Sequence, residues 1–476
     1  TTGTGAVNIT VSGDVIVNSS TSITTESGGI TLSGNAGGST TGVITGVNIN
    51  GATVSTSGSG AISLTGKGGT SQAGLGVLIQ NGGQVLSTAT SSGGGITING
   101  TGKGANAGGY GVQIKDTGTL VDSKSGAIQI TGQGGATASS HGVFLAGGAD
   151  ITSSDATGAA TITISATGGT GSGSGAMVIN DAGSTVSSIA GAIDITATGA
   201  SSGDSGLSGN GGSIESLGAA TLTITGSGTA GPAFSLANVN IGDSTGSGTI
   251  TLKGDEFDLT GTTVIDGQGA LVIEPVTAGK TIGLGGGTGD LNLTDAELAF
   301  LSDGFTSITI GKSDAGNIDI NTASFADALT LINDITNSEI HDQASSTGSP
   351  DLNMTSGDTA TFNGTVAPGQ SPGILNVTGD FAFANNTTFE VEIGGTSPGT
   401  ADTNHDQIDA TGKVTIGSTV TLDLVNFNSF GSSVAIGDKF EIINRDGGTG
   451  MFQGLAEGQT IANFLGSTLT AEISYQ

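Results

Sequence analysis

The sequence predicts an all-β fold, a parallel β-helix (β-solenoid) followed by a Phe-rich C-terminal β-module. Three observations predict it. A short apolar strand recurs eight times at intervals of 28 to 34 residues. Apolar and polar residues alternate within each strand, which is the two-residue period of β-structure. Gly accounts for 90 of the 476 residues and gathers between the strands, where sharp turns need it.

The recurring strand is the first of three strands in each repeat. It occurs at Ile30–Leu32, Ile62–Leu64, Ile96–Ile98, Ile128–Ile130, Ile162–Ile164, Ile193–Ile195, Leu222–Ile224 and Ile250–Leu252. A second strand signal surrounds Val47, Val77, Val112 and Val143, and a third surrounds Val54, Val85, Val121 and Ile151. Three strands with tight turns form one coil, and a coil buries its apolar face only by stacking on its neighbours at about 4.8 Å. We therefore expect Ile, Leu and Val to point inward and Thr, Ser and Asn outward.

Two changes along the chain predict three parts. Residues 1–257 form the solenoid of repeats of about 32 residues, and 258–345 an irregular continuation with a short helix, because Thr294 and Glu297 match a helix capping box. Within it, residues 307–310, 317–320 and 329–332 are expected to resume the coils. Residues 346–476 form the C-terminal β-module, which contains most of the 15 Phe residues and is expected to act as a cap or docking end.

Several stretches resemble one group of proteins. Residues 60–88 (GAISLTGKGGTSQAGLGVLIQNGGQVLST), 293–298 (LTDAEL) and 368–375 (PGQSPGIL) are similar to large repetitive bacterial surface proteins of the filamentous-haemagglutinin and autotransporter-adhesin type. The resemblance implies a right-handed β-helix exported to the cell surface, with no catalytic residues to carry over. Relatives commonly continue beyond the final AEISYQ, so this chain is expected to be processed from a larger precursor.

Composition narrows the classes of partner and the location. The formal charge is −30, from 40 acidic residues against nine Lys and Arg445. So acidic a chain repels nucleic acid and anionic headgroups. No apolar run in the sequence approaches the roughly 20 residues that a membrane-spanning helix needs. Cys is absent, which excludes disulfides and thiolate sites. We expect an extracellular, cell-surface protein with no nucleic-acid partner and no membrane insertion of this chain.

The outward positions of the first strand do not present catalytic chemistry. They are Thr31, Ser33, Ser63, Thr65, Thr97, Asn99, Gln129, Thr131, Thr163, Ser165, Asp194, Thr196, Thr223, Thr225, Thr251 and Lys253. Polysaccharide lyases and hydrolases built on this architecture need converging carboxylates, and His141, His341 and His405 are at least 64 residues apart. The interpretation is therefore that the chain is not an enzyme, with a polysaccharide-active enzyme as the alternative. A second alternative is an ice-binding solenoid, because regular Thr arrays can order water.

One segment matches the start of a calcium-binding loop. Asp402, Asn404, Asp406 and Asp409 supply alternating oxygen ligands of the kind Ca²⁺ prefers. Gln407 stands where such a loop needs Gly, and Lys413 stands where it needs Glu, so a solvated turn is the competing interpretation. No other cofactor is expected.

These observations predict a secreted structural or adhesive β-solenoid at the bacterial cell surface. Unpaired N–H and C=O groups at the solenoid ends and the ladder of Thr residues favour self-association, head-to-tail or lateral, into a filament or matrix. Glycans or other cells are the further partners expected.

Overall fold

The computed structural model describes residues 3–38, 40–333, 339–342, 351–354, 358–368, 372–399 and 401–476. Their regular structure is mostly β-strand, and the helices among them are α1 (Asp295–Leu298), η1 (Phe427–Ser432) and η2 (Phe464–Gly466). None of these helices has the length and apolar character needed to span a membrane. Packing divides the chain into unit 1, Thr1–Leu271 with Phe300–Ser302, and unit 2, Val272–Ala299 with Asp303–Gln476.

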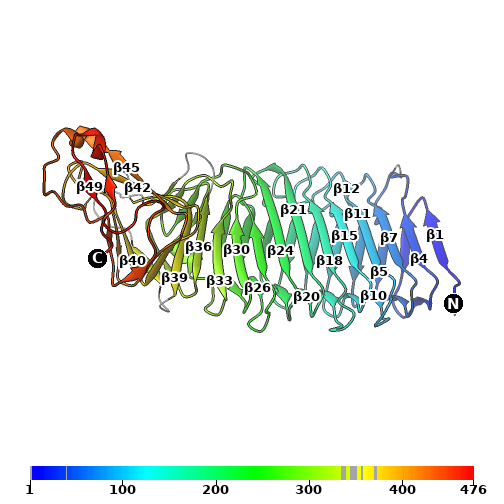
Figure 1. Ribbon diagram of the computed structural model, residues 1–476. Coiled ribbons are helices and arrows are strands. Elements are labelled where there is room, and N and C mark those ends of the chain that lie inside the picture. The colour runs from blue at the N-terminus through cyan, green and yellow to red at the C-terminus, as the bar shows by residue number, and fades with distance from the viewer. Residues whose placement is uncertain are drawn as a thin grey trace. The chain divides into compact units, whose positions relative to one another are not determined.

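Unit 1 is a parallel β-solenoid of nine three-strand coils within the described residues, which confirms the predicted fold class (Figure 1). Its three sheets run along the stack and are named sheets 1 to 3. Sheet 1 contains β1 (Val7–Val11), β4 (Ile30–Gly34), β7 (Ile62–Lys67), β11 (Ile96–Thr101), β15 (Ile128–Gln133), β18 (Ile162–Thr167), β21 (Ile193–Ser202), β24 (Leu222–Thr229) and β27 (Ile250–Lys253).

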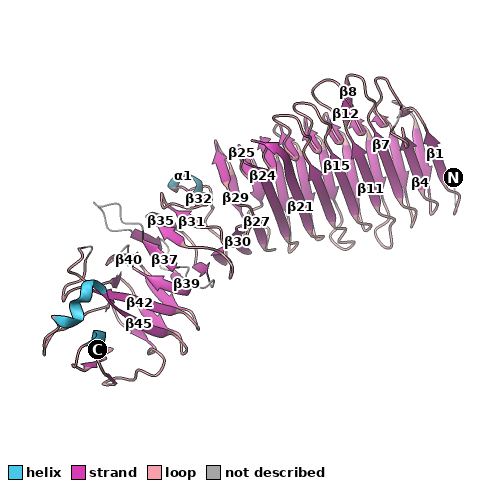
Figure 2. Ribbon diagram, turned by 90° about the horizontal axis from the view of Figure 1, so that it is seen from above, coloured by secondary structure: helices cyan, strands magenta, loops and turns pink. Residues whose placement is uncertain are grey.

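The other two sheets have nine strands each. Sheet 2 contains β2 (Val15–Val17), β5 (Val47–Asn50), β9 (Val77–Gln80), β13 (Val112–Lys115), β16 (Val143–Ala146), β19 (Met177–Asn180), β22 (Leu207–Asn210), β25 (Phe234–Ala237) and β28 (Phe257–Thr260). Sheet 3 contains β3 (Ser22–Thr25), β6 (Thr53–Thr56), β10 (Gln84–Ser87), β14 (Leu120–Ser123), β17 (Asp150–Ser153), β20 (Thr185–Ser188), β23 (Ser213–Ser216), β26 (Asn240–Gly242) and β29 (Val264–Asp266). Two short antiparallel strands, β8 (Ala73–Gly74) and β12 (Lys103–Gly104), lie in loops outside these sheets (Figure 2).

The interior of unit 1 is a continuous stack of aliphatic side chains. Ile98 and Ile130 are register partners in adjacent coils and are 0% and 1% exposed. Full burial of one such side chain stabilises the fold by roughly 1.5–3 kcal/mol. The predicted inward positions of the first strand are all buried in this way, so strand alternation alone places them correctly.

The corner between sheets 2 and 3 turns through left-handed backbone conformations. Asn81 and Gly82 have φ of 55° and 77°, which Asn and Gly adopt more readily than other residues. Side-chain amides also join successive coils here, because the Asn81 amide nitrogen donates to the Asn50 side-chain oxygen at 2.7 Å. The coils are therefore joined at this corner by side chains as well as by the sheets.

The corner between sheets 3 and 1 holds a column of buried hydroxyl groups, one at the end of each of seven successive sheet 3 strands. Its members are Thr25, Thr56, Ser87, Ser123, Ser153, Ser188 and Ser216, and each is at most 4% exposed. The expectation that Thr and Ser point outward is wrong at these positions. An inward hydroxyl is tolerated here because carbonyl groups of the following turn accept its hydrogen bond in several coils, as in Thr25 donating to Gly28 at 2.6 Å.

Unit 2 is also built mainly from parallel strands, beginning near β30 (Ala270–Glu274), which contains the boundary. Its strands are β31 (Ile282–Leu284), β32 (Leu291–Leu293), β33 (Ser307–Gly311), β34 (Ile318–Ile320), β35 (Thr322–Phe325), β36 (Leu329–Asn333), β37 (Glu339–Asp342), β38 (Asp351–Met354), β39 (Thr359–Ala367), β40 (Ile374–Thr378), β41 (Asp380–Phe383), β42 (Thr388–Ile393), β43 (Gln407–Ala410), β44 (Val414–Ile416), β45 (Thr421–Asn426), β46 (Ile443–Asn444), β47 (Gly448–Thr449), β48 (Thr460–Ile461) and β49 (Ala471–Glu472). The strands expected at 307–310, 317–320 and 329–332 appear as β33, β34 and β36. The capping box expected at α1 is formed by Thr294 and Glu297.

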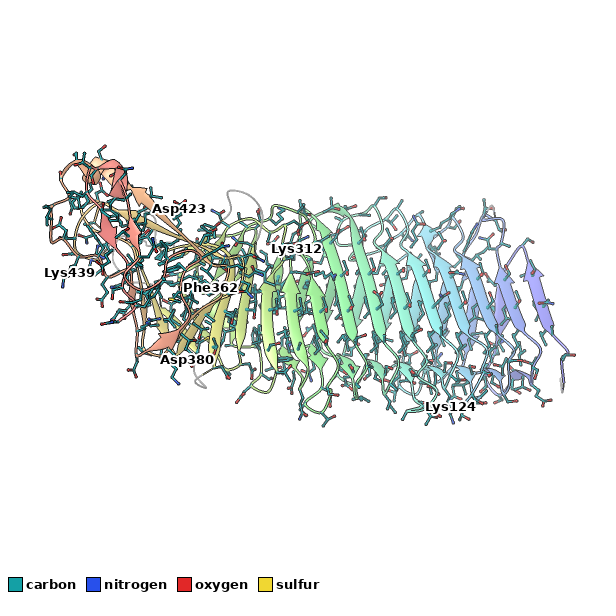
Figure 3. The ribbon with its side chains drawn as sticks, viewed as in Figure 1. Lys124, Lys312, Phe362, Asp380, Asp423 and Lys439 are labelled. Carbon is teal, nitrogen blue, oxygen red and sulfur yellow. The ribbon has the colours of Figure 1, made fainter. Side chains whose placement is uncertain are left out.

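Phenylalanines replace part of the aliphatic stack in unit 2. Phe362, Phe381, Phe383 and Phe389 are each at most 2% exposed, and Phe362 lies inside the unit (Figure 3). Consecutive ring centroids along this series are 4.9, 4.8 and 5.1 Å apart. The rings therefore fill the core, as their alternation with polar residues predicts.

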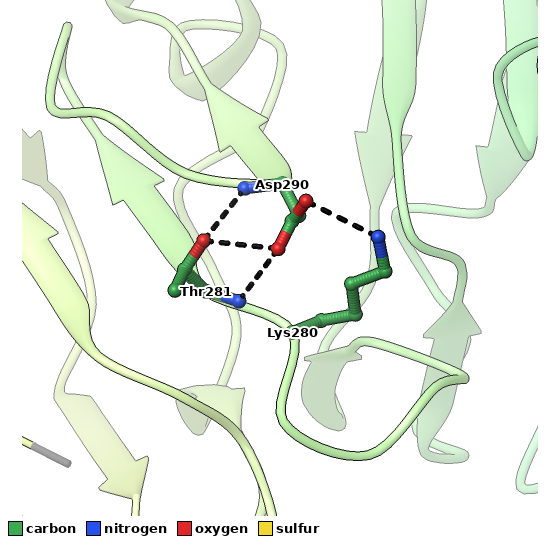
Figure 4. Close-up of polar contacts among 3 residues, drawn as sticks. All are labelled: Lys280, Thr281 and Asp290. Carbon is green, nitrogen blue, oxygen red and sulfur yellow. Dashed lines mark hydrogen bonds and ion pairs between the residues drawn. The ribbon is translucent and has the colours of Figure 1, made fainter.

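A loop of unit 2 is held by one carboxylate. Asp290 accepts from the Thr281 backbone N–H at 3.2 Å and hydroxyl at 3.1 Å, and pairs with Lys280 at 3.1 Å (Figure 4). Burial raises the pKa of Asp290, but the hydrogen bonds from Thr281 and Lys280 outweigh it and hold that pKa below its usual value. The carboxylate thereby fixes the turn that precedes β32.

Candidate functional site

The outer side of sheet 1 is the most regular surface of unit 1. Its strands pair without offset over most of their length, so their outward side chains form straight columns across the coils. We call this surface the hydroxyl face. Its 24 outward positions are Asn8, Thr10, Thr31, Ser33, Ser63, Thr65, Lys67, Thr97, Asn99, Thr101, Gln129, Thr131, Gln133, Thr163, Ser165, Thr167, Asp194, Thr196, Thr198, Thr223, Thr225, Ser227, Thr251 and Lys253.

All sixteen outward positions expected from the sequence belong to this face. They are half-buried or exposed, and those of β15 and β21 are exposed. Seventeen of the 24 side chains are Thr or Ser, four are Asn or Gln, and three are charged. A flat surface of small groups that both donate and accept hydrogen bonds suits contact with another surface better than it suits acid–base chemistry.

Sheet 3 carries carboxylates that were not expected as a group. Asp122 accepts from the hydroxyls of Thr152 at 2.8 Å and Ser154 at 2.9 Å. Burial raises the pKa of Asp150 in the next coil, and the charge of Glu215 raises it further. Reasoning from the first strand alone missed these residues, although the same alternation applied to the third strand places them outward.

Sheet 2 carries an aromatic cluster on its outer side. The rings of Tyr110, His141 and Phe144 are nearly parallel, with centroids 5.0 to 5.6 Å apart. His141 Nδ1 lies 3.1 Å from the Gly175 carbonyl oxygen, and burial lowers the pKa of His141. The three rings pack on one another, and Phe144 is the register partner of the buried Val178 on this outer side of the sheet.

The four residues predicted as calcium ligands lie in unit 2 and have different surroundings. Asp402 is exposed, whereas Asp406 is 1% exposed and accepts backbone N–H groups of Gly373 at 2.6 Å and Glu392 at 2.7 Å. Asp409 accepts from the Asn444 side chain at 2.9 Å. The Asn404 backbone carbonyl accepts from Gly394 at 2.8 Å. Among the described residues, no three His, Asp or Glu side chains are grouped to hold a metal ion.

Two residues of this segment, His405 and Asp406, are buried titratable groups. His405 is 0% exposed, and its ring nitrogens face the carbonyl oxygens of Gly395 at 3.1 Å and Glu441 at 3.3 Å. Burial lowers the pKa of His405 and raises the pKa of Asp406 to about 8. Both are candidates for a pH response of unit 2. The side chain of His341 lies outside the described residues.

A cavity of about 900 Å³ lies within unit 2. Its wall combines strand residues such as Ile416 and Leu424 with C-terminal residues such as Phe440, Phe464 and Ile473. Charged residues such as Lys439, Glu441 and Arg445 also line it. The cavity therefore has a mixed polar and apolar wall beneath the C-terminal segment.

The chain was compared with known proteins at three levels. No protein-family model matches it. No curated protein and no solved structure shows significant similarity to it.

Proposed function

We propose that this chain is an extracellular structural and adhesive β-solenoid of the bacterial cell surface. The resemblance of its repeats to large bacterial surface proteins supports the location. The observation that carries the proposal is the hydroxyl face, which continues in register through nine coils of unit 1. A stiff rod with a long face of mostly hydroxyl and amide side chains can act by contact alone.

The charge of the exterior supports the same function. Copies of so acidic a protein stay soluble and separate unless specific surfaces meet, which is a property of assembly subunits and adhesins. Neutral glycans carry no charge and are not repelled by this exterior. Other copies of the protein can approach at surfaces that are poor in acidic residues.

Two measurements test the proposal. Antibody labelling of intact cells of the source bacterium is expected to place the protein outside the cell, and beads coated with the purified chain are expected to adhere to cells or to one another. Labelling that requires permeabilised cells would contradict the location. Electron microscopy then separates isolated short rods, expected of an adhesin, from long ordered fibres, expected of a filament subunit.

A polysaccharide lyase or hydrolase is the competing candidate, and one observation favours it. Asp122 and Asp150 lie on adjacent coils of sheet 3 and Glu215 lies two coils beyond Asp150, and carboxylates are the groups that glycan cleavage uses. Depolymerisation of neutral and acidic glycans, with and without Ca²⁺, is the test. Cleavage that is abolished in Asp150→Asn would replace the structural function with an enzymatic one.

A further inference from the structure

We propose that the hydroxyl face is a self-association surface, on which the same face of a second copy of this chain packs to form a lateral dimer. The inference deepens the proposed function, because it names the partner of that face. It does not depend on which cells or glycans the assembled protein contacts.

The distribution of charge permits a second copy as the partner. Residues 1–271 contain 15 acidic residues and five Lys, a formal charge of −10. The hydroxyl face contains Asp194, Lys67 and Lys253, a formal charge of +1. Two acidic copies repel each other least where acids are few and Lys residues balance them, so two such faces can meet without net repulsion between carboxylates.

The size of the face matches a stable dimer. Nine strands spaced at about 4.8 Å span roughly 40 Å, and six residues of extended strand span about 20 Å. Each copy would then bury roughly 800 Å², or about 1,600 Å² in total, which is the usual size of a specific protein interface.

The chemistry of the face permits close approach. Thr and Ser are small, so two such faces can pack at about the 10 Å spacing of stacked sheets. Each hydroxyl donates and accepts, so a partner's hydroxyl can replace the water that each loses. The Thr methyl groups add apolar area, and a two-fold arrangement repeats every contact.

Thr131 lies at the centre of the face. It is the middle outward residue of β15, the fifth of the nine strands from β1 to β27 that form this face, and it is exposed. A two-fold axis through the centre of the face places Thr131 opposite Thr131 of the other copy, whether the axis runs along the strands or along the coils. The chain contains no Cys, so one introduced at this position is a unique probe.

Sedimentation equilibrium of the full chain tests the proposal. The double variant Thr131→Asp/Thr196→Asp places two charges on exposed positions of the face and is expected to weaken dimerisation at least tenfold. The control Thr90→Asp/Ser172→Asp adds the same charge at exposed loop positions and is expected to leave dimerisation unchanged. Thr131→Lys/Thr196→Lys serves as the second face variant if the Asp pair lowers the melting temperature.

Cross-linking tests the geometry. A short bis-maleimide is expected to link Thr131→Cys copies into dimers at low protein concentration and to leave Thr90→Cys monomeric.

A wild-type chain that sediments as a monomer at millimolar concentration overturns the proposal, as does a dimer that survives both face variants. Loss of binding to an insoluble neutral glucan in the face variants of a monomeric protein would assign the face to a glycan instead. None of these outcomes decides whether the protein lies at the cell surface, which the antibody labelling of intact cells tests separately.

Discussion

The hydroxyl of Ser87 donates to the carbonyl oxygen of Gly94 at 2.7 Å, across the corner between sheets 3 and 1. Gly94 stands two residues before Ile96, the first residue of β11. The hydroxyls of Thr25, Ser123 and Ser216 make the same bond to the carbonyl two residues before the next sheet 1 strand. The relationship thus recurs in four of the seven coils of the column, where a buried hydroxyl fixes the point at which the next sheet 1 strand begins.

Removal of this hydroxyl is expected to destabilise the rod. Ser87→Ala leaves the Gly94 carbonyl without its donor in a buried corner, and we expect the free energy of unfolding to fall by about 1–2 kcal/mol. Urea unfolding measures the change. Ser172→Ala, at an exposed loop position outside the hydroxyl face, is the matched control and is expected to change stability by less than about 0.5 kcal/mol. Equal losses in the two variants would refute a special role for the corner.

A charge introduced into the aliphatic stack is expected to have a much larger effect. Ile130→Asp places an unpaired carboxyl at a site that is 1% exposed, and we expect a loss of several kcal/mol. Thr90 lies in a loop outside the hydroxyl face and is exposed, so Thr90→Asp is expected to melt close to the wild type. Thermal melting followed by circular dichroism compares them. The assignment of inward and outward faces is wrong if Ile130→Asp melts unchanged.

The fold was predictable from the sequence wherever one short-range rule decides the outcome. Strand alternation places Ile98 and Ile130 inward and Thr131 outward without reference to other coils. Alternation also places Ser87 on the inward side with Val85. The rule that fails there is polarity, which favours the outside, because a carbonyl in the turn makes the inside acceptable. The distance from the hydroxyl to its acceptor along the chain also varies, being seven residues for Ser87 and three for Thr25, so no fixed spacing reveals it.

The candidate site was predictable to a similar extent. The hydroxyl face follows from alternation in one strand, whereas Asp150 was missed because the third strand was not read in the same way. Asp406 was predicted as one of four calcium ligands, with a solvated turn as the competing interpretation. Its burial depends on Gly373 and Glu392, which precede it by 33 and 14 residues and approach only when the coils stack.

His405 is expected to make unit 2 less stable in mild acid. Unfolded His binds a proton near pH 6.5, whereas burial lowers the pKa of His405 in the folded chain. Stability therefore falls as the pH drops through about 6.5 towards the lower folded pKa, because the unfolded state takes up the proton first. His405→Gln cannot titrate, so the wild type is expected to lose stability relative to this variant between pH 7.5 and 5. Urea unfolding at both pH values measures the difference, and a wild type that gains on the variant in acid contradicts the prediction.

Asp406 is expected to act in the opposite direction. Burial raises its folded pKa to about 8, against about 3.9 in the unfolded chain, although the N–H groups of Glu392 and Gly373 favour the charged form. The contribution of this group to stability is then complete below about pH 3.9 and is lost as the pH rises towards 8, because the unfolded chain releases the proton first.

The variant Asp406→Asn isolates that contribution. Asn keeps the size of the side chain and cannot release a proton, so the stability of the wild type relative to the variant is expected to fall by several kcal/mol between pH 4 and 8. The loss of one N–H acceptor in the variant adds a difference that does not depend on pH. Asp402→Asn, at an exposed carboxylate nearby, is the control and is expected to show no such trend. If the wild type instead becomes more stable relative to Asp406→Asn as the pH rises, the two backbone N–H bonds outweigh burial. Asp406 is then a charged carboxylate that holds the Gly373 and Glu392 backbone in place.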